Sequence, residues 1–204
     1  MADPVLFHSR PRRGLIVLLA GLLIAALALI VAPARAAGIV VNTADDNTTA
    51  NDGLCTLREA IVNANGDFDN SLGDCAAGSG DDTITFDGDY TITVASPLDV
   101  LSADALTIDG TGRAVTVSGG GTTTVLGNSS ELVVRGLTLR DGRASYGGII
   151  NNQGTLELVE TVITGGKALA QGGGIWNTFA SLTITDSTVH SNAADDGVNG
   201  VETA

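Results

Sequence analysis

Aromatic, basic and histidine side chains are scarce in this chain of 204 residues. Aromatic residues make up 3% of the sequence, two residues are histidine, and ten lysines and arginines stand against 23 aspartates and glutamates. A nucleic-acid backbone is bound by clustered lysine and arginine, so this balance excludes nucleic acid as the natural partner. The same acidic character favours solubility and can attract divalent cations.

The N-terminal segment has the features of an export signal. A basic stretch precedes an apolar run over 15–31, and Ala34-Arg35-Ala36 then supplies the small-x-small pattern that a signal peptidase accepts. We therefore predict a signal peptide over residues 1–36, cleaved between Ala36 and Ala37, and a protein that is secreted or held at the cell surface. The alternative is an uncleaved N-terminal anchor, because the run of 17 residues approaches the ~17–25 needed to span a bilayer. In both cases we expect contact with the membrane only through this segment.

Cysteine is almost absent. Cys55 and Cys75 are the only two, and an even number in an oxidising destination predicts one disulfide that closes a short loop. After residue 36 the chain has a single histidine, His190. This excludes a metal site built from cysteine and histidine. His190 follows Val189, which we expect to face inward, so His190 should face solvent.

The second half of the chain repeats. Leu132, Leu156 and Leu182 begin three similar segments, each with short apolar–polar alternation followed by turn-forming residues. Three columns are aliphatic in every copy: Leu132/Leu156/Leu182, Val134/Leu158/Ile184 and Leu139/Ile163/Val189. Leu106 and Ile108 extend the first two columns towards the N-terminus.

A second register supports the first. Val125, Ile149 and Ile175 each lie seven residues before the leucine that begins the next segment. The segments 147–151 and 173–177 are near copies of the form Gly-Gly-Ile-x-Asn. This alignment predicts that Ile149 and Ile175 occupy one column.

These patterns predict an all-β solenoid. Strands this short cannot bury a face alone, whereas a repeat of ~20–30 residues can form one coil that stacks on the next at about 4.8 Å. Glycines would supply the corners, where φ is positive. We predict a parallel β-helix of about four coils over residues 83–204. A β-sandwich is the alternative, but its strands do not hold fixed columns at a near-constant repeat length.

Residues 37–82 predict a cap for the N-terminal end of the solenoid. Thr56-Leu57-Arg58-Glu59 has the form of a capping box, and apolar residues follow at helical spacing as far as Ala64. We expect a short helix ending near Gly66 and tethered by the disulfide. An uncovered solenoid end exposes its apolar interior and unpaired strand edges, which this helix would cover. Strands at 82–86 and 90–94 would then begin the first coil.

The segments 41–46 and 55–61 resemble the bacterial domain named for its C-S-L-R-E-A motif, with Thr56 in place of the serine. The Gly-Gly-Ile-x-Asn segments are similar to those of polymorphic outer-membrane proteins and their adhesin relatives. The resemblance covers nearly all of the chain after residue 36. It implies a right-handed, pectate-lyase-like β-helix on an exported bacterial protein, and it implies no catalytic residues.

Glu160 and Asp186 share a column with Gly136 and would stack about 4.8 Å apart. Enzymes that cleave polysaccharides need a base beside calcium, or a carboxylate pair at about 5–10 Å. We interpret the column as a solvated corner, because no lyase or galacturonase motif accompanies it. The sequence thus predicts a non-catalytic surface or secreted module, structural and adhesin-like, with polysaccharides or surface proteins as partners. The alternative is a polysaccharide lyase or hydrolase, or a fragment of one.

Calcium is the one cofactor that the acidic residues suggest. Asp67-Phe68-Asp69 begins like an EF-hand loop, but Leu72 occupies the position that requires glycine and Gly78 that of the glutamate. Irregular calcium binding is the remaining hypothesis, with these candidates: Asp67, Asp69, Asp81 and Asp82.

No further Gly-Gly-Ile-x-Asn segment, helix or anchor follows Val189 in the sequence. A solenoid needs its last coil covered. We therefore expect either a truncated reading frame or a second chain stacked on the open C-terminal coil.

Overall fold

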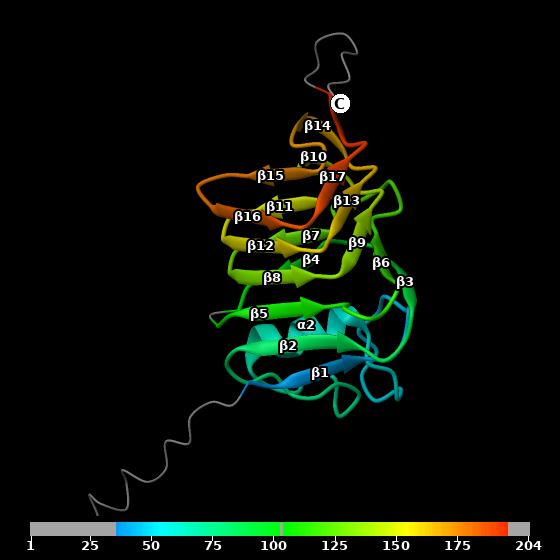
Figure 1. Ribbon diagram of the computed structural model, residues 1–204. Helices are drawn as coiled ribbons and strands as arrows, with labels where there is room; N and C mark the ends of the chain where they lie inside the picture. Colours follow the sequence, from blue (N-terminus) through cyan, green and yellow to red (C-terminus); the bar gives the residue numbers. More distant parts are fainter. Residues whose placement is uncertain (1–35, 103, 196–204) are drawn as a thin grey trace, which may run out of the picture. The chain divides into compact units, whose positions relative to one another are not determined.

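The computed structural model describes residues 36–102 and 104–195 (Figure 1). The apolar run, and with it the predicted signal peptide or anchor, lies outside the described residues. Within them, no helix is both long and apolar enough to cross a membrane.

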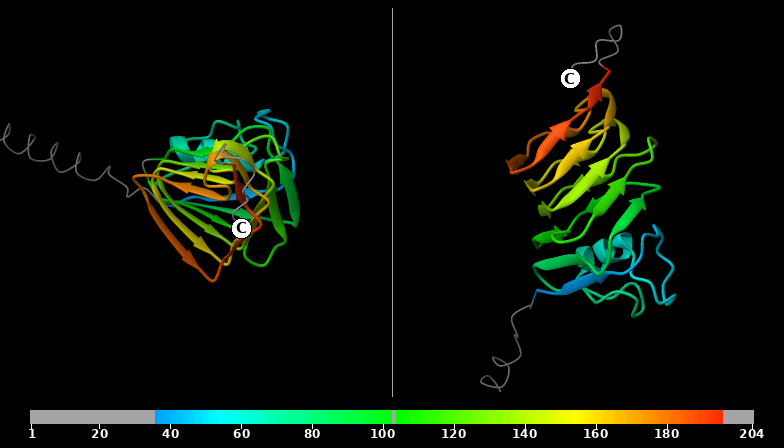
Figure 2. Two further views of the ribbon diagram at one scale, coloured as in Figure 1. Left: turned by 90° about the horizontal axis from the view of Figure 1, so that it is seen from above. Right: turned by 45° about the vertical axis from the view of Figure 1, so that its right-hand side comes forward.

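The chain folds into a right-handed parallel β-helix of about four coils, as the repeats predict (Figures 1 and 2). The first sheet holds β1 (Gly38–Val41), β2 (Asp82–Phe86), β5 (Leu106–Asp109), β8 (Glu131–Arg135), β12 (Thr155–Val159) and β16 (Ser181–Thr185). The second holds β3 (Tyr90–Thr93), β6 (Val115–Ser118), β9 (Leu137–Arg140), β13 (Val162–Thr164) and β17 (Thr188–His190). The third holds β4 (Leu98–Val100), β7 (Leu126–Asn128), β11 (Ile150–Asn152) and β15 (Ile175–Asn177). A short fourth sheet holds β10 (Arg143–Tyr146), β14 (Lys167–Gln171) and β18 (Ala193–Ala194).

The aliphatic columns of the sequence are stacks of inward-facing side chains. Leu156 is paired in register with the leucine before it and the leucine after it, and Leu158 and Ile163 lie in the two other predicted columns. All three are at most 1% exposed. Since side chains alternate along a strand, the residues between them face outward. The three predicted columns are confirmed.

The predicted column that joins Ile149 to Ile175 is wrong. Ile175 pairs with Ile150, whereas Ile149 donates its amide hydrogen to the carbonyl of Gly174. The shift has a local cause, because the register of β10 and β14 breaks between Ala144 and Tyr146 and places an extra residue in β14. The near copies 147–151 and 173–177 are therefore one residue out of step in space.

A ladder of asparagine side chains runs inside the third sheet. The side-chain amide of Asn128 donates to Oδ1 of Asn152 at 2.8 Å, and that of Asn152 donates to Oδ1 of Asn177 at 2.6 Å. Asn152 is fully buried and also donates to the carbonyls of Gly154 and Ser181. The ladder supplies acceptors and donors to the backbone of each turn, which would otherwise be buried without partners.

Helix α2 (Leu57–Gly66) forms as the sequence predicts. Thr56 is its N-cap, and the capping box with Glu59 is present. The helix buries Leu57, Ala60, Ile61 and Ala64. The predicted disulfide, Cys55–Cys75, tethers the segment that leads into it, with a sequence separation of 20 residues.

The helix covers the N-terminal end of the third sheet, where β4 has no neighbouring strand among the described residues. Asn65 donates to the carbonyl of Asp99 at 2.8 Å and accepts from the amide of Leu101 at 2.9 Å. Arg58 donates to the carbonyls of residues 96 and 97 and forms an ion pair with Asp46 at 2.8 Å. Side chains of the cap thus satisfy backbone groups that an exposed strand edge would leave unpaired.

The capping carboxylate has an altered acidity. Glu59 is 3% exposed, and its Oε1 is buried without a hydrogen-bond partner. Burial raises the pKa of Glu59, two hydrogen bonds from Thr56 oppose the rise, and the nearby carboxylates of Asp52 and Asp74 add to it. A carboxyl whose pKa is raised by folding contributes stability that is fully present below its unfolded pKa and is lost as the pH rises through the folded pKa.

We therefore expect Glu59→Gln to increase the free energy of unfolding at pH 7. Glutamine keeps an acceptor for Thr56 and removes the buried charge. The gain should grow as the pH rises, because the pKa of Glu59 is raised by burial and the carboxyl ionises only above its ordinary range. Urea unfolding of both proteins at several pH values measures this. A gain that is the same at every pH would contradict it.

Candidate functional site

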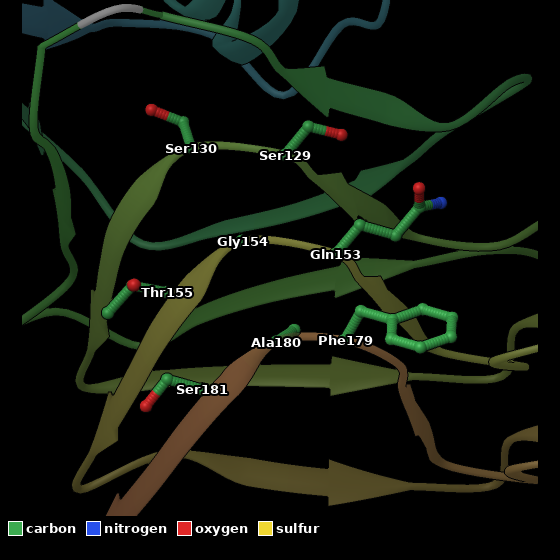
Figure 3. A pocket seen from close by; sticks show the side chains of 8 residues that line it. All are labelled: Ser129, Ser130, Gln153, Gly154, Thr155, Phe179, Ala180 and Ser181. Carbon is green, nitrogen blue, oxygen red and sulfur yellow. The ribbon is translucent and has the colours of Figure 1, made fainter.

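An open groove lies at the corner where each coil passes from the third sheet to the first. Its volume is about 610 Å³. Figure 3 shows the residues that line it: Ser129, Ser130, Gln153, Gly154, Thr155, Phe179, Ala180 and Ser181. They come from three successive coils, so the groove runs along the stack.

The last of these turns is longer than the two before it. Two residues connect β7 to β8 and β11 to β12, whereas residues 178–180 connect β15 to β16. The backbone amide of Gln153 donates to the carbonyl of Asn128, and that of Thr178 donates to the carbonyl of Asn152 in the same way. The backbone amides of Thr155 and Ser181 donate to the carbonyls of Ser130 and Gly154, each in the preceding coil. The side-chain amides of Asn152 and Asn177 donate to the carbonyls of Gly154 and Ala180, so Ala180 corresponds to Gly154 and the inserted residue is Phe179.

Phe179 is in an unfavourable conformation. Its φ is +52°, a region that costs a bulky side chain about 1–2 kcal/mol. Its side chain is fully exposed, at 106%. A strained, bulky residue that buries nothing gains no stability from its place, and such outliers concentrate at functional sites.

Gly154 lies directly against the turn of the preceding coil. A Cβ at this position would clash with the carbonyl oxygen of Ser130. Figure 3 shows the phenyl ring of Phe179 and the amide of Gln153 extending to the same side of the two turns. The hydroxyl groups of Ser130, Thr155 and Ser181 extend to the other side, so the aromatic ring lies nearest to the amide of Gln153 and the hydroxyl group of Ser129.

This lining favours a neutral ligand that carries hydroxyl groups. No residue of the lining is charged, so an ionic ligand would find no opposite charge there. Serine, threonine and glutamine side chains both donate and accept hydrogen bonds, and an aromatic ring packs against apolar faces. The volume falls within the ~300–1,000 Å³ of small-molecule sites.

Glu160 and Asp186 lie at the other end of the strands that leave the groove. They directly follow β12 and β16, with φ of 51° and 48°, and Gly136 takes the same place one coil earlier with a φ of 65°. Five-residue strands separate them from the groove, a rise of about 16 Å. The structure places these two carboxylates at a corner, and it does not bring them together with the groove.

The four carboxylates predicted as calcium ligands accept hydrogen bonds from backbone amides. Asp67 accepts from the amide of Gly80 at 3.0 Å, and Asp82 accepts at 3.0 Å from the amides of Ala37 and Ser79. Asp69 accepts from Ser71 and Asp81 accepts from Ala105, also through backbone amides.

Asp104, which the sequence did not single out, lies near three of these carboxylates. Burial raises its pKa, and Asp67 and Asp81 raise it further. Oδ2 of Asp82 is buried without a hydrogen-bond partner. Within the described residues, no group of three or more histidine, cysteine, aspartate or glutamate side chains is arranged to hold a metal ion.

His190, singled out in the sequence, and Trp176 both lie in the last coil that the structure describes. His190 is exposed, with its Nδ1 3.0 Å from Oγ of the adjacent Ser191. The ring of Trp176 lies 4.9 Å from that of Tyr146 in the preceding coil.

Sequence reasoning missed the groove. The sequence carries one signal of it, the spacing between each asparagine of the ladder and the next inward-facing leucine. This spacing is one residue longer from Asn177 to Leu182 than from Asn152 to Leu156. The difference is visible only when Asn152, and not Asn151, is aligned with Asn177. Neither a protein family, nor a curated protein, nor a solved structure matches this chain.

Proposed function

We propose that the chain is a non-catalytic, exported β-helix module, adhesin-like in character, that binds neutral polysaccharide at the groove beside Phe179. The observation that carries the proposal is the fully exposed ring of Phe179, held in a strained conformation next to uncharged hydrogen-bonding side chains. Sugars present both apolar faces and hydroxyl groups, so they match a lining of this kind.

The charge of the protein narrows the class of polysaccharide. The chain has a formal net charge of −13, which opposes the approach of polyuronates and other polyanions. The groove runs across three coils, so it suits several consecutive sugar units of a chain. The resemblance of residues 41–46 and 55–61 to an exported bacterial domain supports a place at the cell surface, where such polymers occur.

Binding to soluble neutral glucans and galactans tests the proposal. We expect Phe179→Ala to weaken binding about tenfold, because the loss of a stacking contact removes roughly 1.4 kcal/mol. Titration calorimetry with each polymer, and with polygalacturonate as the anionic comparison, measures the effect. Phe68→Ala is the matched control, since Phe68 is also exposed (51%) but belongs to the N-terminal cap.

Two results would count against the proposal. Equal binding by the wild type and Phe179→Ala would show that the groove is not the site. If the wild type released reducing ends from a polysaccharide and Asp186→Asn did not, the protein would be an enzyme. Its chemistry would then lie at the corner of Glu160 and Asp186 and not at the groove.

A further inference from the structure

A pair of aromatic side chains lies on the outer face of the solenoid, on the side of the third sheet. Trp176 is the middle residue of β15, and its two neighbours in that strand pair in register with Ile150 and Asn152, which are fully buried. Since side chains alternate along a strand, Trp176 faces outward. Its ring centroid lies 4.9 Å from that of Tyr146 in the preceding coil, with an angle of 38° between the rings. Tyr146 is 45% exposed, so the pair presents ring surface to solvent.

The pair brings together a residue type that is scarce in the rest of the chain. The sequence has one tryptophan, two tyrosines and four phenylalanines. The tryptophan, one tyrosine and one phenylalanine lie within two successive coils, at Tyr146, Trp176 and Phe179. None of the three belongs to the buried core, which is mainly aliphatic. Their positions therefore serve the surface of the solenoid and not its interior.

The polar atoms of the pair are available to a ligand. Within the part of the chain that the structure describes, neither Oη of Tyr146 nor Nε1 of Trp176 takes part in a hydrogen bond. By contrast, the hydroxyl group of Tyr90 in the second sheet donates to Asp87. A tyrosine hydroxyl both donates and accepts, and the indole nitrogen donates. The pair thus combines apolar rings with unused hydrogen-bonding groups, the combination that suits a sugar.

The surface between the pair and the groove is continuous. Trp176 pairs in register with Asn151, and Oδ1 of Asn151 lies 3.5 Å from Nε2 of Gln153. Gln153 lines the groove, and its amide extends to the same side as the ring of Phe179 (Figure 3). Trp176 and Phe179 are three positions apart in the chain, so at most about 11 Å of backbone separates them. One extended ligand can therefore contact both.

This surface is also uncharged. No charged residue occurs from 144 to 156, the segment with Tyr146, Asn151 and Gln153. None occurs from 168 to 185, the segment with Trp176 and Phe179. These intervals are long for a chain with 23 acidic and ten basic residues. They favour a ligand that is neutral along its length, since an ionic ligand would find no opposite charge between the pair and the groove.

We propose that Tyr146 and Trp176 form a second sugar subsite, and that one neutral polysaccharide chain contacts both this pair and Phe179. The inference rests on the proposed function, and it extends the site from the groove to the outer face of β11 and β15. Both surfaces are open, so the protein binds within a polysaccharide chain and needs no chain end.

The fluorescence of Trp176 tests this directly, because Trp176 is the only tryptophan of the chain. We expect its emission maximum to move to shorter wavelength when the purified full chain is titrated with soluble neutral glucans and galactans, since a sugar on the ring displaces water. The shift should saturate over the concentrations at which calorimetry detects binding. Phe179→Ala should show the same shift at about tenfold higher concentration. This measurement on the wild type needs no substitution and so does not depend on the folding of a variant.

Tyr146→Ala provides a second measurement, by calorimetry. We expect it to weaken binding about tenfold, as the loss of one stacking contact does. The double variant with Phe179→Ala should bind about a hundredfold more weakly, because separate contacts add in free energy. Phe68→Ala, an exposed aromatic residue of the cap, is again the matched control and should bind as the wild type does.

Failure of this inference differs from failure of the proposed function. If a polymer binds and Phe179→Ala weakens its binding, an unchanged emission of Trp176 would overturn the second subsite and leave the groove as the site. Full binding by Tyr146→Ala would have the same meaning. If no neutral polymer binds in calorimetry, the second subsite and the proposed function are both wrong.

Discussion

Replacing Asn152 with aspartate should lower the free energy of unfolding by about 4 kcal/mol. The side-chain amide donates to Asn177 and to the carbonyls of Gly154 and Ser181. Aspartate has nearly the same shape but no hydrogen to donate, so it would set a buried negative charge against three oxygen atoms. Breaking a buried polar network in this way costs about 3–5 kcal/mol.

Asn151→Asp is the matched control. Asn151 is adjacent in sequence but only half-buried, and it pairs in register with Trp176 on the outward side of β11. We expect its effect to stay within about 0.5 kcal/mol. Urea unfolding followed by circular dichroism compares the two. A larger loss of stability for Asn151→Asp than for Asn152→Asp would mean that Asn151 is the inward-facing residue. It would favour the alignment of Ile149 with Ile175 and contradict the pairing of Ile150 with Ile175.

Leu158→Ala should lower the free energy of unfolding by a similar amount, about 4 kcal/mol. Leu158 is fully buried between Val134 and Ile184, in the middle of the stack. Removing its branched end leaves a cavity that neighbouring coils cannot fill, because each coil is held by strand pairing on both sides. Leucine-to-alanine changes at such sites cost about 2–5 kcal/mol.

Leu169→Ala serves as the comparison for this second change. Leu169 is a leucine of the same solenoid, on β14, with its side chain exposed. Its truncation should change the free energy of unfolding by less than about 0.5 kcal/mol. Comparable losses for the two leucines would mean that the columns do not form a closed interior.

The sequence predicted those parts of the fold that repeat or that follow local rules. Columns such as Leu132, Leu156 and Leu182 recur because parallel strands stack residue on residue, so one period reveals the whole sheet. The capping box at Thr56 and Glu59 is a contact between neighbours in the chain, and it needs no tertiary information.

The parts that escaped prediction depend on insertions and on buried polar side chains. An extra residue in β14 shifts one sheet against another, and the sequence does not say where in a coil an extra residue is placed. Asn151 and Asn152 are identical as letters, yet one is partly exposed and the other is fully buried. Phe179 was overlooked for the same reason, because its turn could not be compared with the others before the register was known.

The cap has a further meaning for how the chain folds. In a solenoid each coil contacts mainly the coils beside it, so folding can begin at one end and extend by adding neighbours. Strand β1 and helix α2 come first among the described elements, and β2 pairs directly with β1. Synthesis also proceeds from the N-terminus, and early segments fold first. The cap is thus placed to act as a template, on which each coil can be added in chain order, N-terminal coils first.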